Sequence, residues 1–123
     1  MTINDYLAYV DYFNSRRYDD YYTEDVIVEL PSSRLQGKQA VREFYQDMND
    51  YVHETIRVKK VLMDADTLIA NIWSDFYCHR DREDFVLGPV RRGDLLRVEL
   101  VVLYTLRDNR FSHIRAGRLS QPA

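Results

Sequence analysis

The sequence contains a single cysteine, Cys78, which excludes a disulfide within the chain. It has no run close to the roughly 20 apolar residues of a membrane-spanning helix, and residues 1–10 lack the basic stretch and apolar run of a secretory signal. The net charge of −3 provides no basic surface for nucleic-acid phosphates. We therefore expect a cytoplasmic protein without a membrane or nucleic-acid partner.

Tyrosine is the residue type that stands out, with ten tyrosines against one tryptophan. A tyrosine joins a large apolar ring to a polar hydroxyl, so it suits core packing, pocket walls and interfaces. The chain has 123 residues, of which 46% are hydrophobic. This length and composition predict one globular domain, residues 1–123, with a single core.

Two segments carry apolar residues at helical spacing. In residues 3–13 an apolar stripe recurs at i, i+3, i+4, i+7 and i+10, and Thr2 with Asp5 matches a helix-capping pair. The second helix is expected to open after Gly37, with apolar positions that continue through Val52. A short helical piece over residues 18–22 is expected between them.

The remaining apolar residues follow the pattern of strands. The expected strands cover residues 26–30, 55–63, 68–78, 95–106 and 111–118. Residues 32–37 are predicted to form a loop, and the turn at residues 107–110 contains Asp and Asn, which tolerate positive φ. Residues 79–94 are a long polar connection, and such loops are usually functional or disordered. We expect this loop at the mouth of a pocket.

Alternation along the strands assigns side chains to the two faces of the sheet. The outer face is expected to carry Trp73, Asp75, Tyr77, Val101, Leu103, Phe111 and His113. So many large apolar groups on one face predict a homodimer that covers them. The expected ligand-binding residues on the inner side are Leu30, Phe44, Met48, Ile72, Ser74, Phe76, Leu100, Val102 and Ile114. They predict an apolar cavity of a few hundred cubic ångströms for a small hydrophobic molecule.

Four runs of the sequence carry a family likeness. They are YLAYVDYFNSRRYDDYYTEDVIVELP, LQGKQAVREFYQDM, DTLIANIWSDF and LVVLYTLRDNRFSHIRAGR. Together they cover nearly the whole chain, and they resemble the SnoaL-like branch of the NTF2-like superfamily. The resemblance implies an α+β fold, a cone in which a strongly curved, mostly antiparallel sheet wraps around N-terminal helices. It implies little about the reaction, because this fold hosts many activities.

The resemblance also implies positions for catalytic groups, and most of these are apolar here. Tyr9 matches the oxyanion donor of ketosteroid isomerases, but their base falls on Leu30 and their second acid on Val102. The acid of SnoaL-type cyclases falls on Ala116. Asp75 aligns with an aspartate of limonene-epoxide hydrolase, whose arginine partner is replaced by tryptophan in this sequence.

Two functions therefore stay open. One is an acid–base enzyme of the cyclase, isomerase or dehydratase kind, with Tyr9, Asp75, His53 and Tyr104 as candidate catalytic residues and no metal or cofactor. The other is a noncatalytic ligand-binding or dimerisation domain. A carboxylate or histidine buried in the cavity would favour the enzyme, whereas a cavity with hydroxyls as its polar groups would favour the binding domain.

Overall fold

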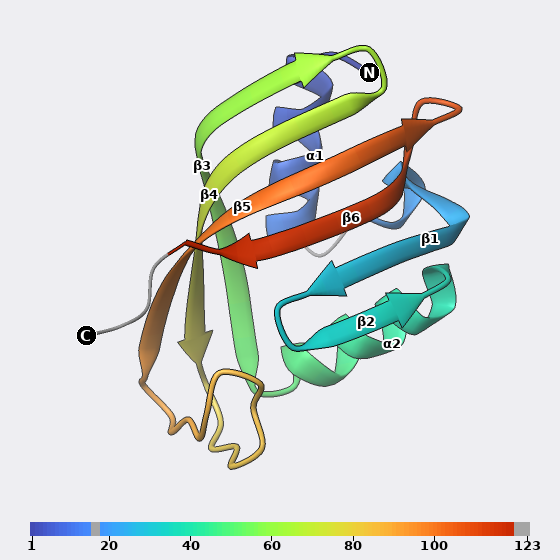
Figure 1. Ribbon diagram of the computed structural model, residues 1–123. Helices are drawn as coiled ribbons and strands as arrows, with labels where there is room; N and C mark the ends of the chain where they lie inside the picture. Colours follow the sequence, from blue (N-terminus) through green and yellow to red (C-terminus); the bar gives the residue numbers. More distant parts are fainter. Residues whose placement is uncertain (16–17, 120–123) are drawn as a thin grey trace.

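The computed structural model describes residues 1–15 and 18–119 (Figure 1). These residues form α1 (Ile3–Asn14), the short 3-10 helix η1 (Asp19–Tyr21), β1 (Tyr22–Leu30), β2 (Ser33–Gln36), α2 (Lys38–Asn49), β3 (Val52–Asp64), β4 (Thr67–Cys78), β5 (Leu95–Arg107) and β6 (Arg110–Arg118). The strands form a mixed sheet in the order β2-β1-β6-β5-β4-β3. Only the pair β1 and β6 is parallel among the neighbouring strands of the described residues. The mostly antiparallel α+β fold is thus confirmed.

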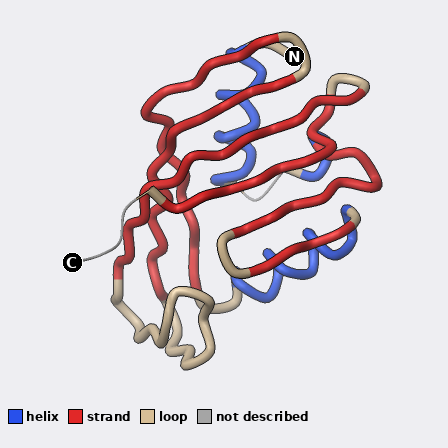
Figure 2. The backbone as a smooth tube through the Cα atoms, in the orientation of Figure 1, coloured by secondary structure: helices blue, strands red, loops and turns tan. Residues whose placement is uncertain are grey.

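The sheet bends around the helices without closing into a barrel. The long strands β3, β4 and β5 curve along their length, and both α-helices lie on the concave side (Figures 1 and 2). A bulge between Val58 and Lys60 interrupts the register near the middle of β3, and such a bulge increases local bending. Helix α1 packs on β3, whereas α2 packs on β1, β2 and β3. This arrangement confirms the expected cone.

Helix α1 forms as the sequence predicts. The Thr2 hydroxyl accepts from the Asp5 backbone N–H, and the Asp5 carboxylate accepts from the Thr2 N–H, which completes a capping box. At the other end, the Asn14 side chain makes two hydrogen bonds to the backbone of Ile56, at 2.7 and 3.0 Å. These hydrogen bonds anchor α1 on β3, and they thereby position the buried tyrosines Tyr6 and Tyr9 of α1.

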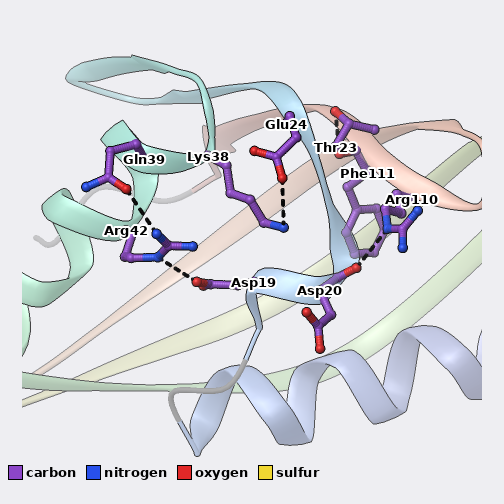
Figure 3. Close-up of polar contacts among 9 residues, drawn as sticks. All are labelled: Asp19, Asp20, Thr23, Glu24, Lys38, Gln39, Arg42, Arg110 and Phe111. Carbon is purple, nitrogen blue, oxygen red and sulfur yellow. Dashed lines mark hydrogen bonds and ion pairs between the residues drawn. The ribbon is translucent and has the colours of Figure 1, made fainter.

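Polar contacts join helix α2 to η1 and to the start of β1 (Figure 3). Arg42 of α2 donates to the Asp19 carboxylate at 2.7 Å, and Lys38 lies 3.7 Å from the Glu24 carboxylate. Arg110, at the start of β6, donates to the backbone carbonyl of Asp20 at 3.1 Å. These contacts fix the N-terminal end of β1 between α2 and the β5–β6 hairpin.

The predicted boundaries on both sides of α2 are wrong. Residues 33–36 form the edge strand β2 instead of a loop, and they pair with residues 27–30 of β1. A four-residue strand is too short for alternation to reveal it. Helix α2 ends at Asn49, and Val52 begins β3 instead of extending the helix. Val52 continues the apolar spacing of the helix, but it is the first buried residue of β3.

The strand register confirms most of the predicted faces. Ile72, Ser74 and Val102 lie on the inner face, whereas Trp73, Tyr77, Val101 and Leu103 lie on the outer one. Phe111 is a correction: it is fully buried against the rings of Tyr6 and Tyr9. A register shift between β5 and β6 lies beside Phe111, and this shift breaks the simple alternation.

The described residues contain no helix long and apolar enough to cross a membrane.

Candidate functional site

A cavity lies between the two α-helices and the inner face of the sheet, where all strands except β2 contribute walls. Its volume is about 50 Å³, which is smaller than the few hundred cubic ångströms expected from the sequence. The lining residues are Tyr9, Phe13, Tyr22, Val28, Leu30, Tyr45, Glu54, Ile56, Ile72, Ser74, Leu100, Val102, Tyr104, Ile114 and Ala116. A cavity of this size holds a few water molecules or the polar end of a ligand.

The structure brings most of the predicted lining residues together. The predicted residues that line the cavity are Tyr9, Leu30, Ile72, Ser74, Leu100, Val102, Tyr104 and Ile114. The other three pack elsewhere in the core: Phe44 contacts the ring of Tyr45, Met48 is buried on α2, and Phe76 packs against Phe85. The inner face was thus predicted in the right register, but the cavity occupies a shorter part of it.

Glu54 is the carboxylate of this cavity, and the sequence analysis missed it. It lies on β3, opposite Phe76 of β4 and on the same face as Ile56. The residue is half-buried, and it lines the cavity together with mostly apolar side chains. Burial raises the pKa of Glu54 from 4.5 to about 7, and the Ser74 hydroxyl opposes part of that rise. The carboxyl therefore changes its protonation state close to neutral pH.

A signal for Glu54 existed in the sequence. The strand was expected to begin at Thr55, three residues after its true start at Val52. From Val52 the inward alternation continues through Glu54, Ile56 and Val58. An acidic residue in an inward position of a half-buried strand is unusual enough to mark a candidate site.

Tyrosine hydroxyls surround the cavity in pairs. Tyr9 and Tyr22 share a hydrogen bond of 2.8 Å, and Tyr6 and Tyr104 share one of 3.0 Å. Burial raises the pKa values of Tyr9, Tyr22 and Tyr104, and it raises that of Tyr6 to about 12. These hydroxyls stay protonated at neutral pH, so they act as hydrogen-bond donors and not as phenolates.

Ser74 places a further hydroxyl in the cavity, one position along the inner face from Glu54. It is 0% exposed. Its Oγ has no hydrogen-bond partner of regular geometry among the residues that the structure describes. Hydrogen bonding from the Ser74 hydroxyl lowers the pKa of the Glu54 carboxyl, but this contact does not reach the geometry of a regular hydrogen bond. The cavity therefore contains a buried hydroxyl that makes no regular hydrogen bond within the described residues, and Glu54 is the protein group that it influences.

Asp75 and His53, two of the predicted catalytic residues, lie outside the cavity. Asp75 is on the outer face, where Arg97 donates two hydrogen bonds to it at 2.6 and 3.1 Å and Arg57 lies 3.3 Å away. Hydrogen bonding to Arg97 holds the pKa of Asp75 below its usual value. His53 pairs with Tyr77 on the same outer face. The structure thus separates these two residues from Tyr9 and Tyr104.

The loop of residues 79–94 packs at the end of the sheet near α2. Phe85 of this loop is buried against the rings of Tyr51 and Phe76. An isolated bridge joins Arg82 to Val90, and the Arg82 guanidinium lies 4.6 Å from the centre of the Tyr51 ring. The loop therefore has its own hydrogen bonds and contributes to the core, while Val86 stays exposed.

The charge of the cavity lining limits the kinds of ligand and reaction that the cavity can support. Among the described residues, the cavity lining includes no Lys, Arg or His to balance Glu54. Residues 1–15 and 18–119 also contain no group of three His, Cys, Asp or Glu side chains that could hold a metal ion. A larger hollow of about 590 Å³ beside the start of α1 is an open groove lined mainly by polar residues such as Asp5 and Asn109. The inner cavity combines a titrating group with hydroxyl donors and apolar walls.

Comparison with known proteins identifies the family. The model of the SnoaL-like domain family matches residues 3–114, and the chain belongs to this family. No curated protein matches the chain by sequence.

Solved structures share the fold at low sequence identity. A candidate polyketide cyclase from Xanthomonas campestris pv. campestris superposes with a TM-score of 0.72 at 20% identity, covering 89% of this chain and 84% of that one. An LEH-like epoxide hydrolase from M. tuberculosis gives 0.75 at 11% identity, with 95% and 81% covered. An NTF2-like protein from Anabaena variabilis gives 0.72 at 15% identity, with 98% and 90% covered. At these identities the likeness establishes the NTF2-like fold and not the activity.

Proposed function

We propose that this protein is an acid–base enzyme that binds a small hydrophobic molecule in the inner cavity and uses Glu54 to transfer a proton. The observation that carries the proposal is a carboxyl with a pKa of about 7 in an apolar, tyrosine-lined cavity. A catalytic acid or base works best when its pKa lies near the working pH. Cyclases and epoxide hydrolases among the structural neighbours are consistent with such chemistry.

The ionised Glu54 takes a proton from the substrate, and the protonated form returns it at the same or a second atom. In an isomerisation the proton count is unchanged, so the reaction needs no co-reactant. The protonated tyrosines are donors for an oxygen that gains negative charge in the transition state. Tyr9, with its partner Tyr22, is the predicted donor that lines the cavity on the α1 side.

The test is a screen for conversion in D₂O, followed by NMR. Small apolar ketones, hydroxyketones and epoxides are incubated with the protein, because a proton returned from solvent-exchanged Glu54 appears as deuterium in the product. For any compound that is converted, Glu54→Gln is expected to reduce the rate by roughly 100-fold or more while the ligand still binds. Glu99→Gln on the outer face is the matched control and should keep the wild-type rate. Equal rates for Glu54→Gln and wild type would contradict the proposal.

A noncatalytic ligand-binding domain is the second candidate. It is favoured by the three cavity positions where the family likeness implies acids, since Leu30, Val102 and Ala116 are all apolar. Ligands that bind in the cavity without conversion across the whole screen would support this second function. Conversion that depends on Glu54 would exclude it.

We also propose that two copies pair through the outer face of the sheet. Leu62, Ile69 and Leu103 lie opposite one another on β3, β4 and β5, and all three are exposed. A row of exposed leucine and isoleucine across three strands is a surface that a partner can cover. Leu103→Arg should shift the protein towards monomer in analytical ultracentrifugation, whereas Val86→Arg in the loop should not. A wild-type monomer at micromolar concentration would contradict the pairing.

The cytoplasmic location expected from the sequence stays a prediction.

A further inference from the structure

Ser74 has a buried hydroxyl that makes no regular hydrogen bond within the described residues. A hydroxyl that is buried without a partner destabilises a folded protein by roughly 1–3 kcal/mol relative to a satisfied one. Buried polar groups in native structures are therefore nearly always paired, and an exception calls for an explanation. Ser74 Oγ is such an exception among the described residues, and it lines the same cavity as Glu54.

We infer that Ser74 Oγ and the Glu54 carboxyl together bind a neutral oxygen group, a hydroxyl or a carbonyl, at the end of an otherwise apolar ligand. Both side chains come from paired strands and sit diagonally on the inner face, since Ser74 is opposite Ile56 and Glu54 is opposite Phe76. One ligand oxygen placed between them satisfies both groups. This inference rests on the proposed function, because both place the ligand in the inner cavity.

The hydrogen-bonding capacities of the two groups fit this ligand. The serine hydroxyl has one donor proton and lone pairs that accept, whereas a carboxyl accepts when ionised and donates when protonated. A ligand hydroxyl donates to the ionised Glu54 and accepts from Ser74. A ligand carbonyl accepts from Ser74 and from the protonated Glu54. Both forms of Glu54 exist near neutral pH, so both kinds of neutral oxygen group are accommodated.

The ionised form of Glu54 disfavours an anionic head group. A ligand carboxylate or phosphate beside the Glu54 carboxyl would meet like charge in an apolar environment, where repulsion is strong. In the described part of the lining there is no cationic side chain to offset that repulsion. The volume of about 50 Å³ accepts the oxygen end of the ligand, and the apolar remainder extends toward Leu30, Leu100 and Ala116, which are only partly buried.

The test compares two ligands of the same shape, phenol and toluene, on wild type and on Ser74→Ala. Binding is followed by NMR titration at millimolar ligand. The ratio of the toluene Kd to the phenol Kd is expected to fall by about tenfold in Ser74→Ala, because the hydroxyl–hydroxyl contact is lost for phenol and was absent for toluene. Ser112→Ala is the matched control, since the Ser112 hydroxyl already donates to the Thr105 carbonyl. It should leave the ratio unchanged.

If the ratio of the toluene Kd to the phenol Kd is unchanged in Ser74→Ala, the inference is overturned. It is also overturned if neither phenol nor toluene binds to the wild-type protein. Ser74→Ala fills no new space and removes an unpaired polar atom, so the variant is expected to fold. A change in the ratio localised by chemical shifts to Ser74 and its neighbours supports the inference even if Glu54→Gln has no effect on conversion. The failure of the proposed enzyme activity is thereby separated from the failure of this ligand assignment.

A second arm tests the charge of the ligand. Benzoate and benzylammonium carry opposite charges on similar rings and are titrated above the Glu54 pKa of about 7. Benzoate is expected to bind at least tenfold more weakly than phenol. Tighter binding of benzoate than of phenol would overturn the assignment of a neutral group. Tighter binding of benzylammonium would also overturn it, in favour of a cationic ligand held by Glu54.

Discussion

Glu54 and Asp75 are two carboxylates on neighbouring strands of one sheet, and they lie on opposite faces of it. Asp75 is 7% exposed and is held by two arginines. Glu54 faces a cavity whose described lining contains no cation. The pKa of Asp75 is lowered and that of Glu54 is raised to about 7. Burial thus raises the pKa of Glu54, where no cation offsets it, whereas at Asp75 the hydrogen bond from Arg97 outweighs burial.

The two faces differ in how they use polar groups. On the outer face, charges are paired: Lys59 donates to Glu99 at 2.7 Å and also lies 4.5 Å from the centre of the Trp73 ring. On the inner face, Tyr9 pairs with Tyr22 and Tyr6 with Tyr104, whereas the Ser74 hydroxyl makes no regular hydrogen bond within the described residues. Paired charges stabilise a surface, whereas unpaired groups in a cavity are available to a ligand.

The largest effect is expected from the pH dependence of stability in Glu54→Gln. The folded pKa of about 7 lies above the ordinary value of 4.5, so the folded state holds its proton more tightly than the unfolded state. Stability is then full below pH 4.5 and falls as the pH rises to about 7. Because one pKa unit corresponds to about 1.4 kcal/mol, the loss is roughly 3 kcal/mol.

Glutamine imitates the neutral carboxyl, so Glu54→Gln should remove this loss. Urea unfolding of wild type and variant across this pH range measures it. The variant should be more stable than wild type above the folded pKa and nearly equal to it at acidic pH. Parallel pH profiles for the two proteins would mean that Glu54 is solvated like a surface carboxylate.

Asp75→Asn is expected to act in the opposite direction. Its lowered pKa means that Asp75 contributes stability above its ordinary value, and that this contribution is lost as the pH falls through the folded pKa. Removing the charge leaves Arg97 and Arg57 without their shared partner. We expect a loss of about 2 kcal/mol at neutral pH, below the range for fully buried pairs because both arginines reach solvent. Urea unfolding at neutral and acidic pH measures the change, and an unaltered neutral-pH midpoint would contradict the role of this ion pair.

Ser74→Ala is expected to stabilise the ligand-free protein by about 1 kcal/mol. Serine-to-alanine changes usually destabilise a protein when the hydroxyl is hydrogen-bonded, but this hydroxyl is buried and unpaired. Thermal unfolding of the variant beside Ser112→Ala gives the comparison. If Ser74→Ala is the less stable of the two, the hydroxyl has a partner in the free protein.

The smallest effect is expected from Glu99→Gln on the outer face. Hydrogen bonds from Lys59 and Asn71 lower the pKa of Glu99, but the Lys59 side chain reaches solvent, which weakens the ion pair. The unfolding midpoint should stay within the measurement error at neutral pH. A shift as large as that of Asp75→Asn would show that the outer face forms one coupled charge network.

Much of the fold follows from local patterns in the sequence. The capping pair Thr2 and Asp5, the stripe of α1 and the turn at Asp108 and Asn109, both with positive φ, were predicted from spacing and residue type. Period-two alternation also assigned the inner and outer faces of β4 and β5. These features depend on near neighbours in the chain, which a sequence displays directly.

The site itself depends on residues that are distant in the sequence. Glu54, Ser74 and Tyr9 meet because β3 pairs with β4 and because α1 lies across the concave face. The sequence alone determined that an inward-facing apolar surface with hydroxyls exists. Only the tertiary structure decided that Glu54 titrates near neutral pH and that Asp75 does not, since a pKa is set by the charges, dipoles and solvent that folding brings around the group.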